Sequence, residues 1–177
     1  FRMTTTTEEA RNTYEVVQKE LENIDIYRDT SIRFLGYSNE IGEAFRSLVH
    51  SSLVRASYVV AFGYVCADAL DKSKKAYKKP WENPSDRSKQ VAIAAGDTFL
   101  WQTLASVVIP GFTINRLCHF SGIILQKTTR LPMGIRKWTT TAIGLGAIPL
   151  IIRPIDAAVE VGMDGWIRPL YQQSHNK

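Results

Sequence analysis

The apolar residues gather in three long blocks, and this uneven distribution limits the possible folds more than any other feature. The blocks lie near residues 47–67, 98–126 and 138–152, and charged residues flank each of them. At a rise of about 1.5 Å per residue, a helix of about 20 residues spans about 30 Å, the hydrocarbon thickness of a bilayer. The blocks therefore predict membrane-spanning helices.

A soluble bundle of unusually apolar helices is the competing interpretation, because the mean hydropathy is only −0.13. Helices on the surface of a soluble protein carry a polar stripe at every third or fourth position. Residues 98–114 show no such stripe, and residues 138–152 have only threonines at one end. We therefore expect an all-α fold, a small multi-span helical membrane protein with amphipathic terminal helices.

Each block departs from an ideal span. Arg55 lies in the first block, where lipid contact would cost about 3 kcal/mol. Pro110 interrupts the second block and predicts a kink or an end, so a kinked span and a shallow re-entrant hairpin both stay open. The third block reaches only about 22 Å, which is short for a span. The numbers of Lys and Arg residues on the two sides do not decide how the protein is oriented in the membrane. Only the re-entrant arrangement would place a clear excess of positive charge on one side.

Four segments outside the spans have patterns of their own. Residues 1–24 predict an amphipathic helix, packed on this protein or docked on a partner, and residues 157–177 an amphipathic C-terminal segment along a surface. The C-terminal stripe comprises Ile155, Val159, Met163, Trp166 and Leu170. Residues 71–90, with Pro80 and Pro84, predict a basic loop, and residues 25–156 form the membrane-embedded core. The sequence begins at Phe1, which leaves a shortened chain and a processed organellar protein as open explanations.

The net charge of +5 permits binding to nucleic acid or to an anionic membrane. The basic residues lie at the ends of apolar blocks rather than among aromatic residues on one face, which argues against nucleic acid and for lipid head groups. The candidate lipid and interface residues are Lys127, Arg130, Arg136, Lys137, Trp138 and Trp81. Gly63 with Ala67, and Ala142 with Gly146, have the spacing that lets helices approach closely.

Three charged residues are candidate intramembrane charges: Arg55, Asp97 and Arg116. Asp97 stands at the start of the second block, where it could pair with Arg116, with Arg55 or with a partner's charge. The simpler interpretation is an N-cap for the helix that follows.

No constellation of residues predicts catalysis or metal binding. Cys118 and His119 are neighbours, but no further zinc ligands accompany them at a workable spacing. Asn39, Glu40 and Glu43 resemble an acid pair, yet a solvated helix face or local ion pairs explain them more simply. The chain lacks a nucleophile elbow, a Walker loop and a dinucleotide fingerprint. We therefore expect no enzyme activity and no cofactor other than bound phospholipid.

Three long motifs point to a family. They are DIYRDTSIRFLGYSNEIGEAFRSLV at 25–49, DTFLWQTLASVVIPGFTINR at 97–116 and RKWTTTAIGLGAIPLIIRPID at 136–156. Together they closely resemble the mitochondrial fission process protein family, also known as the mitochondrial 18 kDa protein. The resemblance covers residues 25–156 and implies a multi-pass protein of the mitochondrial inner membrane, associated with organelle division and membrane integrity. It implies no catalytic residues.

Three functions follow from the patterns and the resemblance. The first is a non-enzymatic inner-membrane protein that supports membrane integrity, morphology and fission through lipid and protein contacts, with cardiolipin as the expected anionic lipid. The second is a structural accessory subunit of a large inner-membrane respiratory or ATP synthase complex, whose other subunits would shield the charges. A carrier is the weakest, since the sequence shows no internal repeat.

Overall fold

The computed structural model describes residues 27, 30–81 and 83–172, and it divides the chain into two units, Phe1–Arg33 and Phe34–Lys177. In the first unit, the backbone N–H of Arg33 donates to the carbonyl of Thr30 at 3.1 Å. The amphipathic helix predicted over residues 1–24 lies outside the described residues.

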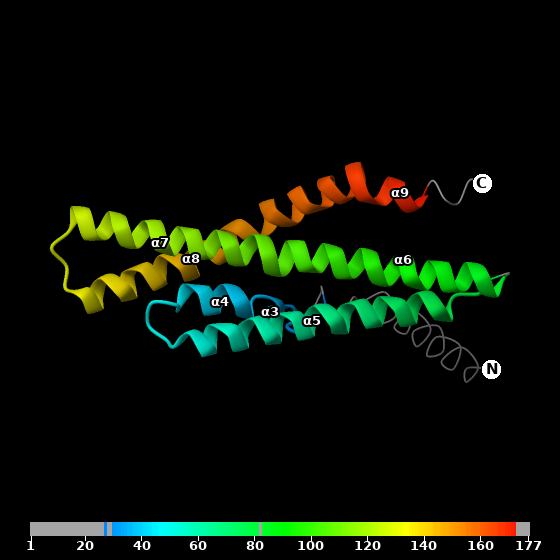
Figure 1. The fold of residues 1–177 in the computed structure, drawn as a ribbon, viewed down its shortest axis with the longest axis horizontal. Coiled ribbons are helices and arrows are strands. Elements are labelled where there is room, and N and C mark those ends of the chain that lie inside the picture. Colours follow the sequence, from blue (N-terminus) through cyan, green and yellow to red (C-terminus); the bar gives the residue numbers. More distant parts are fainter. Residues whose placement is uncertain (1–26, 28–29, 82, 173–177) are drawn as a thin grey trace, which may run out of the picture. The chain divides into compact units, whose positions relative to one another are not determined.

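The described part of the second unit is helical and contains no strand (Figure 1). Its helices are α3 (Arg33–Gly36, beginning one residue earlier), α4 (Ser38–Ala44), α5 (Ser51–Lys78), α6 (Pro84–Gln102), the π-helical η1 (Thr103–Val108), α7 (Ile109–Thr128), α8 (Met133–Gly162), the π-helical η2 (Met163–Ile167) and α9 (Arg168–Gln172). Three stretches are long and apolar enough to cross a membrane: Ser51–Lys78, Pro84–Thr128 and Met133–Tyr171. The expected all-α, multi-span architecture is therefore confirmed.

The long helices enclose a short one. The chain reverses between α5 and α6 and again between α7 and α8 (Figure 1). As a result α5 packs along α6, and α8 packs along α7 and η1. The short helix α4 contacts α5, α7 and α8. A polar segment is thereby held among the three apolar helices.

The structure decides between the two arrangements that Pro110 left open. Residues 84–128 form one continuous helical stretch, so the re-entrant hairpin is wrong. The helix absorbs the proline by widening into η1 just before it, and Pro110 then occupies the first turn of α7, where its missing N–H matters least. The side-chain Nδ2 of Asn39, on α4, donates to the carbonyl of Val107, in η1, at 3.0 Å. A side chain from α4 thus supports the irregular turn.

The loop predicted over residues 71–90 is much shorter than expected. Helix α5 continues through the lysine cluster to Lys78, and the described residues between α5 and α6 that are not helical are 79–81 and 83. Two ion pairs one turn apart stabilise this end of α5, Lys72 with Asp68 at 3.7 Å and Lys75 with Asp71 at 2.9 Å. The lysines therefore extend a helix instead of forming a solvated loop.

The prolines still mark the turn between α5 and α6. Pro80 follows the C-cap of α5, and Pro84 is the first residue of α6. The indole Nε1 of Trp81 donates to the carbonyl of Ala76 at 2.9 Å. Trp81 thus satisfies one of the carbonyls that a helix end leaves without an intrahelical partner.

Two apolar clusters hold the long helices together. One comprises Ala44, Ile114 and Ile148, and the other Trp101, Ala105, Val159 and Met163. The expected C-terminal stripe is only partly correct. Ile155 packs on the second cluster with Val159 and Met163, but Trp166 is 82% exposed and Leu170 76%. Ile167 takes the next position instead, because residues four apart share a helix face.

The small-residue pairs expected to bring helices together do not do so. Gly63 and Gly146 have no neighbouring atoms near the position of a Cβ. The close approaches are at Gly42 against Ser57, at Gly111 against Tyr58 and Asn39, and at Gly144 against Cys118 and Ala44. All three contacts involve α4, so glycine is needed where the short helix meets its neighbours.

Candidate functional site

A buried carboxylate on α4 organises a polar network between three helices. Glu43 is 2% exposed and is held by donors from its own turn, from α5 and from α7. Arg46 donates through Nη2 to Oε1 at 2.5 Å and through Nε to Oε2 at 2.6 Å. Tyr58 Oη donates to Oε1 at 3.0 Å, and Asn115 Nδ2 donates to Oε2 at 2.7 Å. Both oxygens are fully occupied.

This arrangement favours the ionised form of Glu43. Burial by itself works to raise the pKa of this carboxyl, but the hydrogen bonds from Arg46, Asn115 and Tyr58 outweigh it and hold the pKa below its ordinary value. The same contacts raise the pKa of Arg46, chiefly through its hydrogen bonds to Glu43. The pair therefore stays charged at neutral pH and acts as a structural joint rather than as a proton donor.

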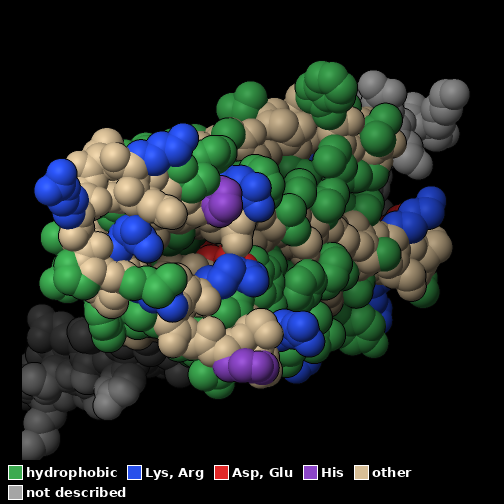
Figure 2. Space-filling view, turned by 60° about the vertical axis from the view of Figure 1, so that its left-hand side comes forward, with side chains coloured by type: hydrophobic (Ala, Val, Ile, Leu, Met, Phe, Trp, Pro, Cys, Tyr) green, Lys and Arg blue, Asp and Glu red, His purple; other side chains and the backbone are tan. Residues whose placement is uncertain are grey.

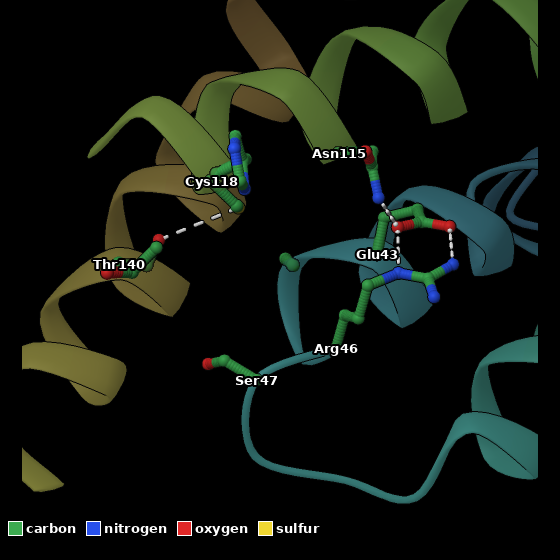
Figure 3. A pocket seen from close by; sticks show the side chains of 8 residues that line it. Glu43, Arg46, Ser47, Asn115, Cys118 and Thr140 are labelled. Carbon is green, nitrogen blue, oxygen red and sulfur yellow. Dashed lines mark hydrogen bonds and ion pairs between the residues drawn. The ribbon is translucent and has the colours of Figure 1, made fainter. Parts of the chain in front are cut away.

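A hollow of about 190 Å³ opens beside this network (Figure 3). Its walls are Glu43, Ala44, Arg46, Ser47, Asn115, Cys118, His119 and Thr140. Figure 3 shows the paired Glu43 and Arg46 on one side and Cys118 with Thr140 on the other, where Sγ donates to the Thr140 carbonyl at 3.7 Å. The hollow can take a small polar group. Its nucleophile, Cys118, has no general base within hydrogen-bond distance among the described contacts.

The predicted lipid residues separate into two groups. Lys127, Arg130, Arg136, Lys137 and Trp138 come together around the turn between α7 and α8. We call these five residues the basic turn. Trp138 is 61% exposed. Trp81 lies instead at the turn between α5 and α6, at the other end of the 45-residue α6–η1–α7 helix, about 65 Å away by helical rise.

Apolar side chains dominate the surface beside these charges. Figure 2 shows Lys and Arg side chains gathered toward the end of this face that carries the α7–α8 turn, with hydrophobic side chains over much of the remainder. Only 33%, 33% and 17% of the residues in the apolar windows of the three long stretches are buried. Large side chains such as Val59, Phe112 and Leu150 point outward at 63–75% exposure. Water is a poor solvent for such a surface.

The three candidate intramembrane charges do not meet one another. Arg55 is exposed near the start of α5. Arg116 is exposed on α7, donates to Asn115 Oδ1 at 3.0 and 3.2 Å and lies over the Phe112 ring. Asp97 is inside α6, so the N-cap interpretation is wrong. It pairs with neither of these arginines.

Asp97 belongs to a cluster that the sequence did not predict. Arg168 donates to it through Nε at 3.1 Å and through Nη2 at 3.2 Å, and Tyr171 Oη donates to it as well. The Nη1 of Arg168 donates to Glu160 at 2.5 Å and to Asp164 at 2.6 Å. The spacing of four between Glu160, Asp164 and Arg168 was the available signal. The cluster ties the C-terminal helices to α6.

The acid pair on α4 is not a solvated face. Asn39 and Glu40 are 0% exposed, and Glu43 is almost fully buried, so that part of the interpretation is wrong. The local ion pair was a correct expectation, since Glu43 binds Arg46 three residues on. The local sequence contained no signal that separates an enclosed acid from a solvated one, because the enclosure comes from helices distant in the chain.

The charge-free segments of the long helices are offset along the bundle. Helix α8 runs antiparallel to α6 and α7. Cys118 contacts Thr140, Ile114 packs with Ile148, and Trp101 packs with Met163. The charge-free residues 138–152 therefore lie beside residues 110–124. Arg153, Asp156 and Glu160 lie beside the apolar residues 98–110. A flat hydrocarbon slab cannot exclude charge from both helices at once.

Metal chemistry has no support in the part of the chain that the structure describes. It contains no group of three or more His, Cys, Asp or Glu residues that could hold a metal ion. Cys118 and His119 both line the hollow, but the third and fourth ligands of a zinc site do not join them.

Comparison with known proteins gives a consistent result. The model of the mitochondrial 18 kDa protein (MTP18) family matches residues 20–163. The chain is 57% identical to mitochondrial fission process protein 1 of Caenorhabditis elegans over 149 residues, which cover 84% of this chain and 90% of the relative. It is 56% identical to the human protein of that name over 83% of this chain and 88% of the relative. The zebrafish (Danio rerio) relative is 54% identical, over 87% and 93% respectively. No solved structure matches the chain.

Proposed function

The chain belongs to the mitochondrial 18 kDa protein (MTP18) family, and from this premise we propose that it is a non-enzymatic inner-membrane protein that supports membrane integrity, morphology and fission. It is a mitochondrial protein with three candidate membrane-spanning helices. The relatives' name supplies the connection with fission, and the structure supplies the physical means by which such a protein could act on a membrane.

The outward-facing apolar surface of the long helices is the observation that carries the proposal. Two thirds or more of each apolar window is unburied within the chain. In water this surface would drive aggregation, whereas in a bilayer it faces hydrocarbon at no cost. The polar side chains that a span must hide, Asn39 and Glu43, are enclosed by α4 and its neighbours. This distribution is typical of a membrane-embedded helical protein.

The basic turn supports the lipid part of the proposal. Lys127, Arg130, Arg136 and Lys137 stand together, and residues 116–137 contain no acidic residue. Each basic residue near an anionic membrane surface contributes about 1 kcal/mol of attraction. Trp138, exposed beside them, suits the interface between head groups and acyl chains. We assign this turn to anionic phospholipid, with cardiolipin as the expected species.

Charge reversal at the basic turn tests the proposal. The variant replaces Lys127, Arg130, Arg136 and Lys137 by Glu, and it is expressed in cells that lack the protein. The wild type should restore fission of an elongated mitochondrial network, and the variant should not. In liposomes, the variant should lose its preference for cardiolipin over neutral lipid.

A matched control distinguishes an effect of the basic turn from an effect of the protein's net charge. Replacing Lys74, Lys78, Lys79 and Lys89 by Glu makes the same charge change at the other end of the α6–η1–α7 helix. This control should restore fission. Equal loss in both variants, or release of the wild-type protein from mitochondria by alkaline carbonate, would remove the lipid proposal. Protease protection after removal of the outer membrane tests residence in the inner membrane.

The offset of the charge-free segments favours a second candidate, an accessory subunit of a large inner-membrane respiratory or ATP synthase complex. Arg153 and Asp156 lie beside the apolar residues 98–110, and a neighbouring subunit could shield them from lipid. A native gel in mild detergent distinguishes the two functions. Migration as small oligomers supports the first function, and comigration with a respiratory complex supports the second.

A further inference from the structure

Glu40 is an acid with no partner in the interior of the helical bundle. Its side chain is 0% exposed, and neither carboxyl oxygen receives a hydrogen bond from another described residue. The neighbouring Asn39 is equally buried, and its Oδ1 also lacks a donor. One turn further along the same helix, Glu43 receives four hydrogen bonds. The two acids of α4 thus occupy opposite electrostatic environments.

The elements around Glu40 offer it no cation. On α5, the titratable groups near this level are Arg55, which is exposed, Tyr58, whose hydroxyl is bound to Glu43, and Tyr64. On α8 they are Asp156, whose negative charge acts on Glu40, and Arg153, which is exposed. Between Asp97 and Arg116, the stretch that contains η1 has no titratable residue. The charges that act on Glu40 are therefore those of other acids.

The helix that carries Glu40 is also closely packed against its neighbours. Gly42 lies so close to α5 that a Cβ there would clash with the Ser57 Oγ. A Cβ on Gly111 would meet the Asn39 Nδ2 at 2.9 Å. Helix α4 is therefore closely packed against α5 near Gly42, and the Asn39 side chain is closely packed against α7. A hydration shell could form only if α4 moved away from α5 and α7.

We propose that Glu40 is a proton-binding site whose neutral form permits α4 to dock between α5, α7 and α8. An ionised carboxylate without partners in such an enclosure is strongly unfavourable, so the proton stays on the acid. When Glu40 releases its proton to bulk water, the carboxylate must be hydrated and α4 must loosen. Helix α4 also carries Glu43 and supports η1 through Asn39. Proton release would therefore loosen the packing of α4 against α5, α7 and α8.

The electrostatics agree with this geometry. Burial raises the pKa of the Glu40 carboxyl from 4.5 to about 8, its own backbone amide opposes the rise, and the charge of Asp156 adds to it. Because the folded protein binds the proton more tightly than the unfolded chain, the stabilisation is complete below about 4.5. It decreases as the pH rises toward about 8 and is lost above that. The site therefore titrates in the physiological range.

Thermal unfolding of the full chain in detergent micelles tests the proposal. The apparent Tm of the wild type should fall steadily between pH 5 and pH 8 and then level off. Glu40→Gln, which keeps the shape and removes the titration, should be folded and should show a markedly smaller fall. Asp156→Asn is the control that keeps Glu40 and should retain the fall. An equal slope in the wild type and Glu40→Gln would overturn the proposal.

Infrared spectroscopy gives a second measurement that does not depend on stability. The wild type at pH 7 should show the carbonyl stretch of a neutral carboxylic acid, which disappears above pH 8 and is retained in Asp156→Asn. Its absence at pH 7 would overturn the proposal even if Glu40→Gln did not fold. The exchange of the α4 amides, corrected for intrinsic rates, should accelerate above pH 8.

Added sodium or potassium ions test whether Glu40 binds a proton or a metal cation. If sodium or potassium ions at constant pH raise the Tm of the wild type but not of Glu40→Gln, the acid holds a cation, and the proton-binding proposal fails. Independence from these ions supports it. The proposal concerns the interior of the bundle and does not rest on the proposed role in fission, which can fail separately.

Discussion

Two charge clusters, one built around an acid and the other around an arginine, hold this molecule together in different ways. The Glu43 centre consists of Glu43, Arg46, Tyr58 and Asn115, and the Arg168 centre consists of Arg168, Asp97, Glu160, Asp164 and Tyr171. In the first, one enclosed acid receives several donors. In the second, one arginine donates to three acids, and the acid side chains are 24%, 45% and 61% exposed.

The difference shows how burial controls the strength of a charge cluster. At the Glu43 centre a single acceptor, which is 2% exposed, serves every donor, so the centre depends on one residue. At the Arg168 centre the acids are redundant and solvent competes with each of them, so no single acid is indispensable. The first centre should therefore be fragile and the less sensitive of the two to salt, and the second should be robust and more sensitive to salt.

Glu43→Gln should have the largest effect. The substitution places an NH₂ group where Arg46, Tyr58 or Asn115 now donates, which leaves part-buried donors without an acceptor. We expect a loss of about 3 kcal/mol in the free energy of unfolding. The measurement is denaturant unfolding in detergent micelles at pH 7. Glu160→Gln is the matched control at the Arg168 centre and should lose less than about 1 kcal/mol.

The effect of Glu43→Gln on stability should also depend on pH, in a direction that the pKa of Glu43 determines. The folded pKa of Glu43 is lowered, so its stabilising contribution is present above the unfolded value of 4.5 and is lost as the pH falls through the folded pKa. The difference in stability between the wild type and Glu43→Gln should therefore shrink on acidification. A difference that grows toward low pH would contradict the ionised state of Glu43.

Gly144→Ala should have the next largest effect. The added Cβ would lie 2.6 Å from the Cys118 Sγ and 3.0 Å from the Ala44 Cβ, so the wall of the hollow beside the Glu43 centre must shift. Overpacking of this kind costs about 1–3 kcal/mol. Gly146→Ala, two residues along the same helix, meets no atoms within 4 Å and should be neutral or stabilising by up to about 1 kcal/mol. Equal Tm values for the two variants would contradict the close packing.

Asp97→Asn should weaken the Arg168 centre by about 1 kcal/mol, because Arg168 keeps its bonds to Glu160 and Asp164. The loss should be smaller in high salt, which screens partly exposed pairs. Unfolding at low and at high sodium chloride measures both effects. A loss as large and as independent of salt as that of Glu43→Gln would erase the proposed difference between the centres.

Asp164→Asn should have the smallest effect, a few tenths of a kcal/mol. Asp164 has the most exposed acid side chain of the cluster, at 61%, and it lies one turn from Arg168 on the same helical stretch. The same unfolding measurement applies. A loss greater than that of Asp97→Asn would indicate that the contact within the helix, and not the contact to α6, dominates the Arg168 centre.

Much of the fold could be predicted from local patterns. The three apolar blocks correctly predicted an all-α, multi-span protein, because hydropathy and length are properties of single segments. Pro80 and Pro84 correctly marked the turn between α5 and α6. The extent of that turn was wrong, since ion pairs one turn apart prolong α5 through its lysines. Pro110 did not end its helix, because η1 absorbs it.

The charge partners were beyond local reasoning. Asp97 binds Arg168, which is 71 residues away, and Glu43 binds Asn115, which is 72 residues away. No spacing rule connects such positions, because antiparallel packing of long helices sets which turns face each other. The basic turn, by contrast, was visible in the sequence, because its residues are neighbours in the chain as well as in space.

The sequence by itself determined the membership in the family, the helical class and the three apolar stretches, since each depends on residue order and on the free energy of transfer from water to lipid. Only the tertiary structure decided which polar residues of α4 are buried and which of them have hydrogen-bond partners. Asn39, Glu40 and Glu43 look alike in the sequence as a solvated polar face. The helices that enclose them come from distant parts of the chain, and this enclosure makes one acid a charged joint and the other a carboxyl without a partner.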